Sequence, residues 1–107
     1  MTTAKITYNF TALLTLLSTD NGGRKKPIVN YYRPSFMFGS EEHFSGEIEL
    51  IGQKEIAPGN SATVKIKLLP SKHISHHLRD GDMFKVLEGN KLVGMGVISK
   101  IEIRKSA

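Results

Sequence analysis

The sequence predicts an all-β protein built from short antiparallel strands, arranged as a barrel or a sandwich. Apolar and polar residues alternate with period two in several segments, which is typical of strands with one buried face. Turn-forming residues punctuate the chain densely, and no segment sustains the 3.6-residue period of an amphipathic helix. We therefore expect six strands in one domain that covers residues 1–107.

The first predicted strand begins near the N-terminus. Ile6, Tyr8, Phe10 and Ala12 alternate with polar residues, and the pattern then runs into a leucine-rich stretch. Because this stretch is apolar at neighbouring positions, its period is ambiguous. We expect the strand to continue through it, with a short helix over residues 12–17 as the alternative.

The two middle strands are predicted at Phe44–Leu50 and Ser61–Leu69. The polar face of the first is acidic, with Glu47 and Glu49, whereas the polar face of the second carries two lysines at alternate positions. Opposite charges that face each other across neighbouring strands stabilise a sheet. If these strands are neighbours, we expect their charges to pair.

A hairpin is predicted at the end of the chain. The runs Met83–Glu88 and Lys91–Ile103 are separated only by a Gly-Asn dipeptide, the two-residue spacing of a tight turn. Gly94 and Gly96 lie inside the second run, where glycine weakens a strand unless the backbone bends or is closely approached. We therefore expect the last strand to curve at these positions.

Composition narrows the possible functions. The 107 residues include 15 Lys and Arg against 10 Asp and Glu, a formal net charge of +5, and no cysteine. A chain of this length has room for one core and no separate nucleotide-hydrolysing domain. The absence of cysteine excludes a disulfide framework and a thiolate zinc site, and cytoplasm is the expected compartment. We expect no membrane span and no signal peptide, and the positive charge favours an acidic partner, above all nucleic acid.

We predict no catalytic site, metal or cofactor. The chain lacks a phosphate-binding glycine motif, and the adjacent Glu41 and Glu42 point apart in an extended segment. No serine lies in a nucleophile-elbow pattern. The one histidine cluster, at His73, His76 and His77, has a spacing that matches no known ligand pattern. We interpret it as a solvated loop.

The candidate site is a basic loop. The run Arg24–Lys26 follows two glycines, and Arg33 adds a further cation. Such side chains bind phosphates, while nearby hydroxyls and backbone amides fix the register of a nucleic acid. The adjacent Tyr31 and Tyr32 offer a ring that can stack on a base. The alternatives are a loop that is charged only because it is solvated, and at least one of these tyrosines in the core.

Five motifs occur in order along residues 8–103. Gly-Gly-Arg is followed by Tyr-Arg-Pro-Ser-Phe-Met-Phe, and the remaining three motifs are Phe44–Leu50, Ala57–Asn60 and Glu88–Ile101. The chain resembles the C-terminal (third) domain of elongation factor Tu, which has Gly-Gly-Arg-His and then Tyr-Arg-Pro-Gln-Phe-x-Phe. The resemblance implies a closed six-stranded antiparallel β-barrel without GTPase activity.

The resemblance also implies partners. In that family the barrel packs against a second barrel and the GTPase domain, contacts the exchange factor, and touches the T-stem backbone of aminoacyl-tRNA. It therefore implies a non-catalytic, translation-related module that binds tRNA or another structured RNA weakly through its backbone. The alternative is a protein-interaction module that docks on a translation GTPase or its exchange factor, or that self-associates.

The resemblance carries over to six candidate RNA-binding residues. They are Arg24, Lys25, Ser35, Ser45, Lys72 and Gly89. Arg24 and Gly89 match family residues, Lys25 replaces a histidine, Ser35 replaces a glutamine, and Ser45 replaces a threonine. A family lysine falls on Lys72 only after a shift, because the loop that follows the Ser61 strand is longer in this chain.

Overall fold

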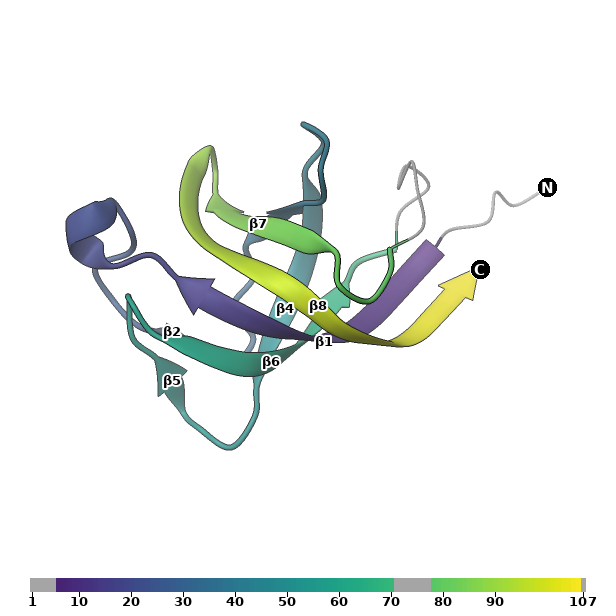
Figure 1. Ribbon diagram of the computed structural model, residues 1–107, viewed down its shortest axis with the longest axis horizontal. Coiled ribbons are helices and arrows are strands. Elements are labelled where there is room, and N and C mark those ends of the chain that lie inside the picture. Colours follow the sequence, from purple (N-terminus) through teal and green to yellow (C-terminus); the bar gives the residue numbers. More distant parts are fainter. Residues whose placement is uncertain (1–5, 71–77, 107) are drawn as a thin grey trace.

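The structure, a computed structural model, describes residues 6–70 and 78–106. Six antiparallel strands close a barrel in the order β1, β6, β4, β3, β7, β8, and β2 and β5 form a separate two-stranded sheet (Figure 1). The strands are β1 (Ile6–Leu16), β2 (Ile28–Val29), β3 (Ser35–Met37), β4 (Phe44–Leu50), β5 (Glu55–Ile56), β6 (Ser61–Leu68), β7 (Met83–Glu88) and β8 (Lys91–Ser106). The predicted all-β class and the closed six-stranded barrel are confirmed. Among the described residues, no helix is long and apolar enough to span a membrane.

The leucine-rich stretch belongs to β1, which pairs with β8 as far as Leu16. Leu14 and Leu16 are buried whereas Leu13 is exposed, so the period of two persists to the end of the strand. The alternative helix over residues 12–17 is therefore wrong. A single 3-10 turn, η1 (Thr19–Asn21), follows the strand instead.

Aromatic rings fill the barrel interior. Phe10, Phe36, Phe38 and Phe84 are buried, and Phe84 lies 5.7 to 6.0 Å from the other three ring centroids. Gly96 makes room for this cluster, because a Cβ there would lie 2.3 Å from Phe84 Cζ. Glycine at this position therefore serves close packing.

β8 curves around the barrel, as predicted (Figure 1). Its register with β7 shifts between Val86 and Leu87, so that one extra β8 residue, Val93, is accommodated in a bulge. Gly94 lies opposite Val86, and a Cβ on Gly94 would lie 2.9 Å from the carbonyl oxygen of Thr15. The bulge and the close approach of β1 explain why position 94 is occupied by glycine.

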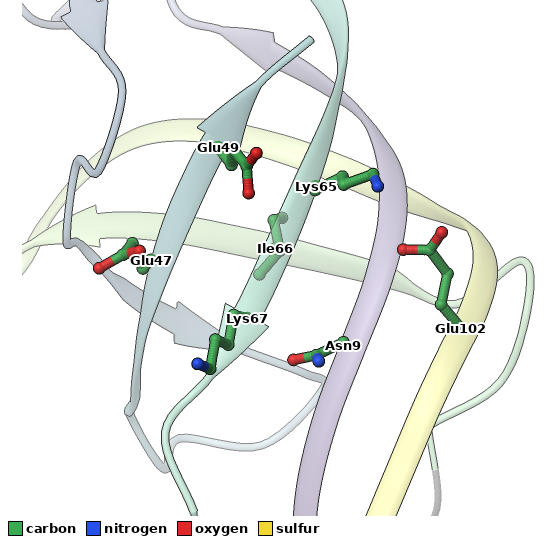
Figure 2. A pocket seen from close by; sticks show the side chains of 7 residues that line it. All are labelled: Asn9, Glu47, Glu49, Lys65, Ile66, Lys67 and Glu102. Carbon is green, nitrogen blue, oxygen red and sulfur yellow. The ribbon is translucent and has the colours of Figure 1, made fainter.

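The acidic and basic strands are neighbours. Glu47 lies opposite Lys67, and Glu49 lies opposite Lys65. An open groove of about 330 Å³ runs over these side chains between β4, β6, β1 and β8 (Figure 2). Within the described part of the chain, however, neither glutamate forms an ion pair within 4.0 Å with the lysine opposite it. Glu47 forms an ion pair with Arg33 instead. The two strands are therefore neighbours, but the expected pairing of these four charges is wrong, because the opposed side chains do not form ion pairs with each other.

Candidate nucleic-acid interface

Two of the predicted residues lie side by side on the barrel surface. Ser35 on β3 is opposite Ser45 on β4, and on its other side it is opposite Leu87 on β7. The neighbouring Phe36 and Phe44 are buried in the core. Because alternate residues of a strand point to opposite faces, both serines point outward.

The Arg24 side chain joins the basic loop to the end of β7. Its Nη1 donates to Glu88 Oε2, its Nε donates to the carbonyl oxygen of Lys26 at 3.1 Å, and its Nη2 donates to the carbonyl oxygen of Pro27 at 3.5 Å. The guanidinium also lies over the Tyr32 ring, 4.7 Å from its centroid. All three nitrogens of Arg24 are therefore engaged within the molecule, and they hold the loop in one shape.

Tyr32 completes this cluster. Its hydroxyl donates a 2.5 Å hydrogen bond to Glu88 Oε2, and its ring packs against the core. Burial raises the pKa of Tyr32, while the positive charge of Arg24 opposes the rise. The phenol is therefore a protonated donor at neutral pH. Tyr32 is thus half-buried against the core, which favours for this residue the alternative that at least one of the two tyrosines is a core residue.

Tyr31 is different, because 64% of it is exposed. Its φ of 67° lies in the left-handed region, which is unfavourable for an aromatic residue. The conformation is held in place by its N–H, which donates to the carbonyl oxygen of Ile48 at 2.9 Å, and by the Tyr32 carbonyl, which accepts from Ile48 N–H at 2.9 Å. An exposed ring is thus presented by a strained backbone.

Exposed cations surround the Arg24 cluster. Lys25, Lys26 and Lys91 are exposed. Arg33, whose side chain is 76% exposed, donates from Nε to Glu47 Oε2 at 3.0 Å and forms an ion pair with the same oxygen, which lies 3.0 Å from Nη2. Because this carboxylate and Glu88 are each paired with an arginine, neither of them cancels the charge of the lysines. Arg33 and Lys91 are not in the predicted set, although Arg33 was visible in the sequence as part of the basic run.

Two glycines shape the edges of this surface. Gly89 has a φ of 60° in the β7–β8 turn, and a Cβ there would meet nothing within 4 Å, so the turn is not crowded at this position. At Gly23 a Cβ would lie 2.2 Å from the carbonyl oxygen of Leu17. The basic loop can therefore pack on the end of β1 only with glycine at that position.

Lys72 and the histidine cluster fall in residues 71–77, outside the described residues. The Leu69 N–H donates to the Ser45 carbonyl oxygen at 2.9 Å, so the chain leaves β6 beside Ser45. Five predicted residues are thus linked through strand pairing and the Arg24–Glu88 contact. The described residues contain no group of three or more His, Asp or Glu side chains arranged to hold a metal ion.

The chain was compared with models of known protein families. The model described as the elongation factor Tu C-terminal domain matches residues 3–102. The matched range includes all six predicted residues and the barrel strands up to residue 102, so that only the end of β8, which continues to Ser106, lies beyond it.

Proposed function

Because the chain belongs to the elongation factor Tu C-terminal domain family, we propose that it is a binding module that contacts the backbone of tRNA or another structured RNA. The family itself makes the chain a translation-related β-barrel module. The RNA contact, a role without catalysis and a place in the cytoplasm are the further parts of the proposal.

The observation that carries the proposal is the positive surface around the Arg24–Glu88 pair. The exposed ammonium groups of Lys25 and Lys26 lie next to this pair, and Lys91 follows the β7–β8 turn. Lysine ammonium groups neutralise phosphates, whereas hydroxyls and backbone N–H groups fix the register of a nucleic acid. The outward hydroxyls of Ser35 and Ser45 supply such donors, and the exposed Gly89 lies in the turn before Lys91. A-form RNA is recognised in this way, through its backbone and 2′-hydroxyls.

Arg24 has a positioning role in this proposal. Its guanidinium neutralises the Glu88 carboxylate, which would otherwise repel a phosphate, and its bonds to the loop carbonyls hold Lys25 on the outer side. The Arg24 side chain is 21% exposed, so part of it still faces a ligand. We therefore expect that loss of Arg24 lowers the affinity for RNA by more than the loss of one phosphate contact would.

The test is titration of the chain with tRNA at several salt concentrations. About four phosphate contacts give a log–log salt slope of about −3 to −4, with a micromolar or weaker dissociation constant. Lys25→Ala should reduce the magnitude of the slope by about 1. Lys100→Ala is the matched control, because Lys100 is an exposed lysine far along β8 from the turn. The proposal would be refuted if binding did not depend on salt, or if Lys25→Ala and Lys100→Ala lost the same amount of tRNA affinity.

A second candidate function is docking on a translation GTPase or its exchange factor. The observation that favours it is the exposure of Leu13, Met83, Met95 and Val97, large apolar side chains that monomeric proteins rarely group on one surface. Gel filtration of the chain with a purified translation GTPase tests this candidate. A complex that persists at high salt supports docking, whereas separate elution of the two proteins refutes it.

A further inference from the structure

One outer face of the barrel is apolar. Met83 on β7 lies opposite Val97 on β8, which lies opposite Leu13 on β1, and Met95 is two residues before Val97. Their exposed fractions are 69%, 38%, 47% and 41% in that order. We call these four side chains the methionine face. Since residues two apart on a strand share a side of the sheet, the four form a continuous surface.

The methionine face has both a projection and a hollow. Met83, the most exposed large apolar side chain of the described residues, is one of the residues that line an open hollow of about 400 Å³. Met37, Phe84 and Met95 also line this hollow, together with the exposed Glu41 and Lys85. Methionine is flexible and polarisable, so it adapts to an apolar hollow.

We propose that the methionine face binds a second copy of this chain in a two-fold dimer. In such a dimer one surface meets itself, so Met83 of each copy enters the hollow of the other. The border charges suit the same symmetry, because Lys85 of one copy then faces Glu41 of the other. The surface is complementary to itself, because the projecting Met83, the hollow and the charges of Lys85 and Glu41 all lie on it.

Charge and size also favour a second copy. The chain carries a net charge of +5, but the charged residues beside Met83 balance, with Glu41 and Lys85 along the hollow and Arg79 and Asp82 next to it, so repulsion between copies is not concentrated there. The four side chains expose on the order of 350 Å² per copy, at the scale where apolar patches mark interaction sites. With the border residues, the interface lies near the lower end of the sizes of specific interfaces, so we expect the dimer to be weak.

The methionine face leaves the RNA-binding surface free. Met83 begins β7 and Glu88 ends it, so the two surfaces lie at opposite ends of one strand, about 17 Å apart. Dimerisation through strand edges is disfavoured on β8, where the Ile101 N–H already donates to Asp80 Oδ1 at 2.8 Å. The dimer is therefore independent of the proposed RNA contact, and each can fail without the other.

Sedimentation velocity of the full chain, without RNA, over about 1 to 200 µM tests the dimer. The wild type should change from monomer to dimer across this range. Met83→Glu should raise the dissociation constant at least about tenfold, because it places a charge in the hollow of each partner. Ile51→Glu is the matched control, since Ile51 is 44% exposed and outside the methionine face. Thermal unfolding checks that both variants fold, and tRNA titration should give the same affinity for both.

Charge exchange tests the orientation of the two copies. Lys85→Glu should weaken the dimer, and adding Glu41→Lys should restore it. A wild type that stays monomeric at all concentrations overturns the proposal, as does equal weakening by Met83→Glu and Ile51→Glu. A monomer that forms a salt-resistant complex with a translation GTPase, lost in Met83→Glu, also overturns it and assigns the face to that partner.

Discussion

Replacement of Arg24 by alanine separates the structural role of this residue from that of its neighbour Lys25. Arg24→Ala removes two hydrogen bonds to loop carbonyls, the ion pair with Glu88 and the contact with the Tyr32 ring. The hydrogen bonds are worth about 0.5–1.5 kcal/mol each and the ring contact about 0.5–1 kcal/mol. Glu88 is 37% exposed at its side chain, so solvent screening limits the ion pair to about 0–1 kcal/mol.

Because these contacts are coupled and partly replaced by water, we expect Arg24→Ala to lower the free energy of unfolding by about 2 kcal/mol. That loss corresponds to a fall in melting temperature of roughly 8–15 °C for a domain of this size. Lys25→Ala, whose side chain is exposed, should change the free energy of unfolding by less than about 0.5 kcal/mol.

Urea unfolding and tRNA titration of both variants provide the assay. The expected result is that Arg24→Ala loses both stability and RNA affinity, whereas Lys25→Ala loses affinity alone. If Arg24→Ala is as stable as the wild type, the loop does not depend on the cluster and the positioning role is refuted. If Lys25→Ala binds tRNA as the wild type does, the RNA contact lies elsewhere.

Three other substitutions probe neighbouring features. Tyr31→Asn should raise the free energy of unfolding by about 0.5–1 kcal/mol, because asparagine tolerates the left-handed backbone; urea unfolding measures this effect. The same substitution should weaken tRNA binding if the Tyr31 ring stacks on a base, which titration with tRNA measures. Gly96→Ala should destabilise the barrel by about 2–4 kcal/mol, since the new methyl collides with the Phe84 ring; an unchanged melting temperature would contradict the packing. Burial raises the pKa of Tyr32 above 10.0, so folding favours its neutral phenol, and this contribution is present below pH 10 and lost as pH rises through the raised value. The urea midpoint should therefore fall at high pH, and it should fall less in Tyr32→Phe.

Local patterns account for the parts of the fold that were predicted correctly. The strand Phe44–Leu50 has the predicted bounds, and the turn between Glu88 and Lys91 closes the predicted hairpin. In Phe44–Leu50 one side of the strand is buried and the other is solvated, so alternation is visible in the residues themselves, whereas the hairpin was recognisable from the two-residue spacing of its Gly-Asn turn. β2 and β5 have two residues each, which is too few for any period to appear.

The ambiguity of the leucine-rich stretch has a specific cause. Leu13 points outward, but it belongs to the apolar methionine face, so β1 is apolar on both sides at this point. Alternation disappears when neither side of a strand is polar. The feature that obscured the strand in the sequence is therefore the same feature that marks an exposed apolar surface.

Residue types and local spacing were sufficient for the strands, the turns and the basic loop, because each depends on neighbours within a few positions. They could not assign the partners of the loop. Arg24 reaches Glu88 across 64 positions, and Leu13 meets Val97 only through the pairing of β1 with β8. Barrel closure and strand register set these contacts, and both arise from packing between distant segments. The tertiary structure thus shows that Arg24, which the sequence predicted as a phosphate-binding residue, holds its own loop in place. It also shows that apolar residues far apart in the sequence lie together on one face.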